Sequence, residues 1–160
     1  MIRLGKMTDY GLVLMSQIAR RPRKELHTAR DLAVECHLPL PTVSKLLKRL
    51  LASGLLASHR GIKGGYSLAR EPNLISLAEM ISALEGPLAL TECSTEVVGL
   101  CDLESSCPIK NNQRIISQVL RGALEKVMLS DLIRPLRLIA IRDGRGNLVP
   151  TVHLSSGRMQ

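Results

Sequence analysis

The sequence is nearly devoid of aromatic residues: it has no Phe, no Trp and only two Tyr in 160 residues. Proteins that bind single-stranded nucleic acid stack its bases on aromatic side chains, so this absence weighs against that class. Duplex DNA requires no such platform. No apolar run approaches the roughly 18 residues that span a bilayer, and the polar first ten residues lack the apolar core of a signal peptide. We therefore expect a cytoplasmic protein without a membrane segment.

Charge is unevenly distributed along the chain. Residues 1–70 hold 13 Lys and Arg against 4 Asp and Glu, residues 71–107 hold none against 7, and residues 108–160 hold 9 against 3. The first 70 residues are therefore the strongly basic part of a chain whose net charge is +8. Such a distribution is expected where one part of a protein faces phosphate. A solvated basic surface without a nucleic-acid partner is the alternative.

Helix-period apolar patterns occur three times in the first 54 residues. In the third, Val43, Leu46, Leu47 and Leu50 form the apolar stripe, and hydroxyl and basic residues fall on the other side. Two helices joined by a short turn, the second presenting such side chains, indicate a helix-turn-helix; an amphipathic helix with a solvated basic face is the alternative. The expected limits are Thr8 or Asp9 capping the first helix, Thr28 with Asp31 capping the second, Pro41 starting the third and Gly54 ending it.

Residues 55–69, LLASHRGIKGGYSLA, predict two strands around a glycine-rich basic turn. A hairpin directly after a recognition helix is typical of the wing of a winged helix. Arg60 at its base is the residue type that enters a narrow minor groove. A connecting hairpin with incidental charge is the alternative. The expected fold class is mostly α: a winged helix-turn-helix with a β-hairpin wing and a long C-terminal helix.

Three of the four cysteines are spaced C-x7-C-x5-C, at Cys93, Cys101 and Cys107. A helix with a capping box at Ser76 and an end at residues 86–87 is expected just before them. Thiolates bind iron–sulfur clusters or zinc, although no His lies between residues 59 and 153 to complete a zinc site. A disulfide with a spare thiol and an incidental loop also remain open. Cys36 is expected to be a small buried hydrophobe.

The last third of the chain is expected to begin with the longest helix, opened by Pro108. Its apolar stripe is too wide for one small domain to cover, so we expect a dimer interface; a helix buried within one subunit is the alternative. Residues 133–160 alternate weakly around a turn signal at 143–147 and are expected to form a hairpin or remain loose. The expected segments are 1–74 for DNA binding, 75–107 for the connecting helix and cysteine loop, 108–132 for dimerisation and 133–160 for the tail.

Several strings resemble one family of winged-helix regulators, which includes IscR and NsrR. The wing HRGIKGGYSLA, the following ISLAEMISALEGPLALTEC and the cysteine cluster carry the resemblance, which covers residues 1 to about 132. TVSKLLKRL and GPLALTEC resemble most the proteobacterial regulators of the SUF iron–sulfur assembly operon. The resemblance implies a homodimeric repressor on a pseudo-palindromic operator, modulated by an iron–sulfur cluster, [2Fe-2S] rather than [4Fe-4S]. The alternatives are a nitric-oxide- or redox-sensing repressor of the same family and a DNA-binding protein that is held together by structural zinc and has no regulatory switch.

Site residues follow from this resemblance position by position. The base-contacting start of the recognition helix corresponds to Thr42, Ser44 and Lys45, and the wing arginine to Arg60. The hydroxyls and the lysine differ from the Glu and Gln of IscR, so we expect a different operator sequence. The full expected DNA-binding set is Thr28, Thr42, Ser44, Lys45, Lys48, Arg60, Lys63, Gly64 and Gly65.

The expected cluster ligands are Cys93, Cys101 and Cys107. IscR supplies a histidine three residues after its last cysteine, but Lys110 occupies that position here and cannot serve. Asp9 aligns with an acidic residue that some relatives contribute from the partner subunit, although a helix cap is its simpler role. Other candidates for the fourth ligand are Asp102, Glu104, Asn111, Asn112 and water. No nucleophile–base pair, P-loop or paired carboxylates are present, so we do not expect an enzyme.

Overall fold

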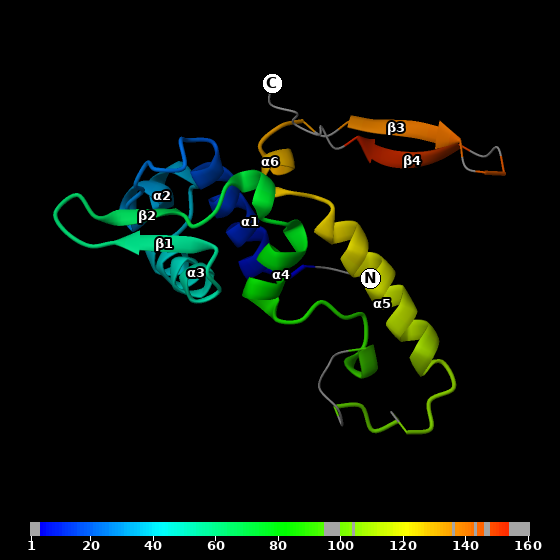
Figure 1. Cartoon of the computed structure of the whole chain (residues 1–160). Helices are drawn as coiled ribbons and strands as arrows, with labels where there is room; N and C mark the ends of the chain where they lie inside the picture. Colours follow the sequence, from blue (N-terminus) through cyan, green and yellow to red (C-terminus); the bar gives the residue numbers. More distant parts are fainter. Residues whose placement is uncertain are drawn as a thin grey trace.

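The computed structural model describes residues 4–94, 100–103, 105–135, 137–142, 144–145 and 148–153. It is mostly helical, with two separate two-stranded sheets (Figure 1). In chain order the elements are α1 (Lys6–Ala19), α2 (Ala29–Glu35), α3 (Leu40–Ala52), β1 (Leu56–His59), β2 (Gly65–Leu68), η1 (Pro72–Leu74), α4 (Leu77–Glu85), η2 (Glu92–Ser94), α5 (Lys110–Glu125), α6 (Leu129–Leu132), β3 (Arg137–Arg142) and β4 (Leu148–His153).

The apolar core lies among α1, α3 and α4, and is closed by the wing strands and by Leu129 of α6. The expected stripe of α3 is confirmed, because all four of its apolar side chains are fully buried. Leu14 of α1, which the helical pattern did not single out, is also fully buried. Burial of these side chains from water holds the recognition helix in place.

Local capping chemistry sets several helix ends as expected. The Thr28 hydroxyl accepts a hydrogen bond from the Asp31 backbone N–H at 3.2 Å, which caps α2. Ser76 and Glu79 form the predicted capping box of α4. Gly54 follows the end of α3 with φ of 74° and Gly86 ends α4 with φ of 100°, a left-handed conformation that glycine adopts without strain.

Three helix starts differ from expectation. Gly5, not Thr8 or Asp9, is the N-cap of α1; Thr8 is fully buried inside the helix, so its hydroxyl cannot cap it. Pro41 is the second residue of α3, because the turn of helix begins at Leu40. Pro108 precedes α5 by two residues, since the backbone at Ile109 is not yet helical (φ −105°, ψ 4°).

The predicted wing is present: β1 and β2 pair antiparallel from Leu56↔Leu68 to His59↔Gly65. β2 also forms a backbone bridge close to the turn, in which the His27 N–H donates to the Tyr66 carbonyl at 2.9 Å and the Tyr66 N–H donates to the His27 carbonyl at 2.8 Å. These two hydrogen bonds therefore join the wing to the segment between α1 and α2, in addition to the pairing of its own two strands.

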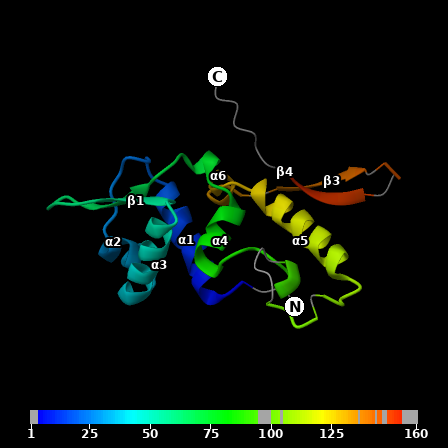
Figure 2. The same ribbon diagram turned by 60° about the horizontal axis from the view of Figure 1, so that its bottom comes forward.

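α5 is the longest described helix and runs away from the core, with η2 beside it (Figures 1 and 2). The tail, expected to form a hairpin or remain loose, contains a hairpin: β3 pairs with β4 antiparallel, and the hairpin projects from the body beyond α6. Residues 143, 146 and 147 of its expected turn lie outside the described residues. Across the described part of the chain, no helix is both long and apolar enough to cross a membrane.

Candidate DNA-binding face and cysteine site

The N-terminal half of α3 carries the expected base-contacting residues. Thr42 and Ser44 are half-buried in the first turns, and Lys45 is exposed. No side chain caps the start of α3. Its first backbone N–H groups therefore have no side-chain acceptor at the helix start. They lie at the positive end of the helix dipole, where an anion such as a phosphate is favoured.

Four basic side chains on α3 and the wing have no partner among the described residues, in contrast to most arginines of the same half. Within the described part of the chain, no side-chain hydrogen bond or ion pair engages Lys45, Lys48, Arg60 or Lys63. Elsewhere in that half, arginines bind glutamates: Arg21 with Glu25 at 2.7 Å, Arg23 with Glu71 at 3.2 Å and Arg70 with Glu79 at 2.7 Å. Unpaired cations remain available for phosphate.

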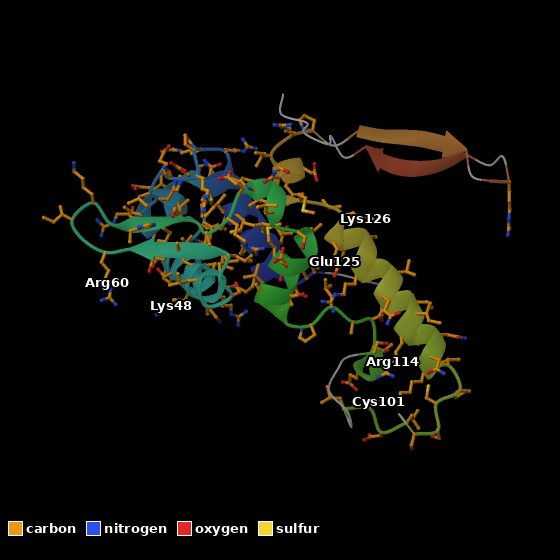
Figure 3. The ribbon with its side chains drawn as sticks, viewed as in Figure 1. Lys48, Arg60, Cys101, Arg114, Glu125 and Lys126 are labelled. Atoms are coloured by element: carbon orange, nitrogen blue, oxygen red, sulfur yellow. The ribbon has the colours of Figure 1, made fainter. Side chains whose placement is uncertain are left out.

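The wing places Arg60 and Lys63 in solvent, on either side of the fully exposed Ile62. Figure 3 shows Arg60 of the wing and Lys48 of α3 along the same edge of the molecule. An α-helix and a basic hairpin on one edge match the way winged helices place a helix in the major groove and a wing beside it.

Gly64 and Gly65 are required by the shape of the wing. A Cβ on Gly64 would lie 2.4 Å from the His59 carbonyl oxygen, and a Cβ on Gly65 would lie 2.8 Å from the His27 carbonyl oxygen. Both neighbours are backbone atoms, which cannot move aside without breaking the hairpin or its bridge to His27. These two glycines therefore shape the wing in addition to any contact they make with DNA.

Thr28 differs from the other expected DNA contacts, because its hydroxyl is already bonded. It donates to the Asp31 carboxylate at 2.6 Å while accepting from the Asp31 N–H. His27, the residue beside it, was not predicted from the sequence; it is buried, and its Nε2 atom is unpaired. Burial lowers the pKa of His27, so the ring is neutral near pH 7.

Two of the three loop cysteines have described side chains. Cys101 and Cys107 are free and half-buried, whereas the Cys93 side chain, like Glu104, lies outside what is described. Within the described residues, no three His, Cys, Asp or Glu side chains gather as a metal site. Cys36 is also free and half-buried rather than fully buried, and its burial raises the pKa of its thiol.

Asp9 is exposed on the first turn of α1. It borders a shallow groove of about 320 Å³ with Val13 and Arg20 of the same helix and Leu132 of α6. An exposed carboxylate on this groove is accessible to a second subunit.

Arg49 is a positioning residue that the sequence did not reveal. Its Nη1 atom donates to the Leu84 carbonyl at 2.7 Å, linking α3 to the last turn of α4. The helical pattern places Arg49 on the polar side of α3 and carries no signal for this bond. The chain leads from the end of α4 through Gly86 toward the cysteine loop, so the recognition helix is bonded to the helix that precedes this loop.

The fold and this basic edge define a winged-helix DNA-binding regulator. The family model of Rrf2, described as an iron-dependent transcriptional regulator, matches residues 4–135, and the chain belongs to this family. It is a transcription regulator and not an enzyme.

Relatives and solved structures agree with this assignment. The transcriptional regulator NsrR of Shouchella clausii is 27% identical over 132 residues, covering 82% of this chain and 89% of the relative. IscR of Cronobacter sakazakii is 27% identical over 146 residues, covering 91% and 89%. The structure of CymR, the global cysteine regulator of B. subtilis, superposes with a TM-score of 0.64 at 26% identity, covering 83% of this chain and 97% of that one.

Proposed function

We propose that this protein is a homodimeric repressor that binds a pseudo-palindromic operator and carries an iron–sulfur cluster, [2Fe-2S] rather than [4Fe-4S], which alters operator binding. The observation that carries DNA binding is the set of unpaired cations on α3 and the wing (Figure 3). The resemblance of TVSKLLKRL and GPLALTEC to SUF regulators supports iron–sulfur assembly genes as targets.

On the operator, the start of α3 enters the major groove. Thr42, Ser44 and Lys45 contact base edges there, since hydroxyls and amines bond to base donors and acceptors. Arg60 enters the adjacent minor groove, and Lys48 and Lys63 contact phosphates. Phosphate contacts supply affinity and base contacts supply specificity, so these groups respond differently to salt and to operator sequence.

A second copy of the chain covers the outer face of α5. Ile115, Ile116 and Val119 are 58%, 50% and 69% exposed, although the helix is strongly amphipathic. An apolar helix face left in water is stabilised by pairing with a copy of itself, and a twofold axis then sets two recognition helices against two half-sites.

The donors around the cysteine loop suit a cluster. Cys101 and Cys107 are free thiols in a stretch without Lys or Arg, and Cys93 is the third donor. Cys107 lies just before α5. A bound cluster supplies a group that changes oxidation state or is lost under oxidants. Asp9 of the partner subunit is the proposed fourth ligand.

Cluster state reaches the DNA through α4. A change in the cysteine loop moves the chain after Gly86, and the bond from Arg49 to the Leu84 carbonyl transmits that displacement to α3. The two recognition helices of the dimer then change their spacing, which requires two dimer geometries of different operator affinity.

The test is anaerobic purification followed by an absorption spectrum and by iron, sulfide and zinc analysis, then operator titration with cluster-bound and cluster-free protein. We expect a brown protein whose two forms differ in operator affinity. Equal affinities would contradict the switch, and a colourless protein with stoichiometric zinc would favour a structural zinc site. A brown protein whose spectrum bleaches with nitric oxide would be compatible with both the iron–sulfur-assembly regulator and the nitric-oxide sensor.

The fourth ligand has its own test. Asp9→Ala is expected to shorten the lifetime of the cluster in air while leaving the cluster-free dimer intact, because the variant removes a ligand and no core contact. Asp102→Ala, at an exposed acid of the cysteine loop, tests the competing candidate in parallel. A shortened lifetime in Asp102→Ala alone would assign the role to Asp102, and unchanged spectra in both variants would leave Asp9 as part of the first turn of α1.

A further inference from the structure

A cavity of about 250 Å³ lies between α5 and the segment at residues 87–94, which leads to the cysteine loop. It is separate from the DNA-binding edge and from the apolar face of α5. One wall is formed by residues of the segment and the other by residues of α5: Pro87, Leu88 and Ser94, then Arg114, Ser117, Gln118 and Arg121.

The α5 residues of this cavity form one row along the helix. They are spaced i, i+3, i+4 and i+7, which places their side chains on one face. Ile116 and Val119 fall on the opposite side, so a second subunit that covers those two residues leaves this row free. Figure 3 shows Arg114 on the side of α5 toward η2, and η2 packs against α5.

The cavity is rich in hydrogen-bond donors, and no carboxylate is among the described residues that line it. Arg114 forms no hydrogen bond or ion pair with any residue that the structure describes. Arg121 binds Glu125 through Nε at 3.0 Å, which leaves its two terminal nitrogens for another partner. Ser117, 6% exposed, accepts the Leu90 N–H at 3.1 Å and keeps its own hydroxyl proton to donate.

We propose that this cavity binds a small organic dianion with two separated acidic groups, such as a dicarboxylate. Arg114 and Arg121 are two turns apart, about 10 Å along the axis, so each can bind one end of such a molecule. Ser117 and Gln118 lie between them, and Pro87 and Leu88 supply an apolar surface for the carbon chain.

A ligand at this position would hold the 87–94 segment against α5. The segment ends at the first cysteine, and the bond from the Leu90 N–H to Ser117 already joins its middle to the helix. Binding of the dianion is therefore a second way to fix the position of the cysteine loop, in addition to any cluster. The binding itself needs neither cluster nor DNA, so its failure and the failure of the proposed repressor function are distinguishable.

The test is isothermal titration of the cluster-free full-length protein with succinate, glutarate, inorganic phosphate and butyrate. Saturable binding of a dicarboxylate is expected, with butyrate and phosphate at least about tenfold weaker because each leaves one guanidinium unused. Arg114→Gln and Arg121→Gln are each expected to weaken dicarboxylate binding by about tenfold or more.

Two variants serve as controls. Lys126→Gln removes a cation just after α5 that does not line the cavity, and is expected to leave the affinity unchanged. Glu125→Gln breaks the ion pair but keeps the guanidinium of Arg121, and is expected to bind the dicarboxylate as well or more tightly. Far-ultraviolet circular dichroism confirms that each variant is folded.

Three results would overturn the proposal. The first is the absence of saturable binding for both dicarboxylates, and the second is phosphate binding as tightly as they do. The third is an equal loss of affinity in Arg114→Gln and Lys126→Gln, which would indicate a general effect of charge on α5.

Discussion

The two halves of the protein differ in how they bury apolar surface. Of the twelve largest fully buried side chains among the described residues, eleven precede Gly86 and the twelfth is Leu129. α5, by contrast, buries only Ser117 and leaves its apolar face in water. The DNA-binding half therefore has a complete core, whereas the α5 half has an apolar face that no described residue covers.

This difference indicates where regulation can act. A close-packed core holds the recognition helix in one position, because its side chains fill the available space. A helix and loop with few buried contacts have a low free energy of local opening, so a ligand or a second subunit can change their arrangement at small cost. The bond from Arg49 to the Leu84 carbonyl lies within the core half, at the end of α4 from which the chain leads on to the cysteine loop.

The largest expected effect is in the core of the DNA-binding half. Leu47→Ala is expected to lower the free energy of unfolding by about 2–5 kcal/mol, because Leu47 is fully buried and leaves a cavity. Leu103→Ala, the same change at a side chain that is 65% exposed in the cysteine loop, is expected to cost less than about 0.5 kcal/mol. Chemical denaturation measures both, and equal losses would remove the distinction between the halves.

The next effect concerns the outer face of α5. Val119→Asp is expected to raise the dimer dissociation constant on the order of 100-fold, because the interface would bury an unpaired carboxylate. Val34→Asp is a close control, since Val34 of α2 is 70% exposed and Val119 is 69% exposed. Analytical ultracentrifugation separates the outcomes; equal dissociation of both variants would exclude α5 as the specific interface.

A smaller effect is expected at the wing. Arg60→Ala is expected to weaken specific operator binding by about 1–3 kcal/mol, the scale of one base contact. Arg134→Ala removes the same charge beyond α6, away from the basic edge, and is expected to change affinity far less. Fluorescence anisotropy with operator and scrambled duplexes measures both, and an unchanged footprint for Arg60→Ala would remove this residue from the site.

The smallest effect is a pH dependence from His27. Burial lowers the pKa of His27 in the folded protein below 6.5, so the unfolded chain takes up the proton first as the pH falls. The stability associated with the neutral ring is complete above pH 6.5 and is lost as the pH falls below that value. His27→Gln is expected to reduce the difference in melting temperature between about pH 7.5 and about pH 5.5.

His37→Asn is the control for this pH effect, at an exposed residue whose positive φ of 53° Asn also adopts. It is expected to keep the pH dependence of the wild type. The same slope in His27→Gln as in the wild type would show that His27 does not contribute.

Local chemistry explains what could be predicted in advance. Thr28 and Ser76 bind backbone N–H groups three residues on, and the glycine-rich turn of the wing matches its hairpin, so short stretches were sufficient. The start of α1 was not predictable in the same way. Gly5 donates its N–H to Glu85, 80 residues away, and that contact extends the helix beyond the local capping signal.

The candidate sites likewise contain features that the sequence predicts and contacts that only the structure shows. The basic face of α3 and the row of cysteines are visible in the sequence because they depend on composition and spacing along one segment. The bond from Arg49 to the Leu84 carbonyl and the bridge from His27 to Tyr66 join residues 35 and 39 positions apart, and no periodicity encodes them.

By itself, the sequence of this protein determined the winged helix-turn-helix, the basic character of its first 70 residues and the resemblance to a regulator family. These properties rest on local capping, helical periodicity and motif spacing. Tertiary structure alone decided which cations stay unpaired, that the apolar face of α5 remains in water, and that Arg114 and Arg121 line one cavity with Pro87 and Leu88. The physical reason is that pairing and burial depend on which distant segments pack together, and the pattern of one segment does not contain that information.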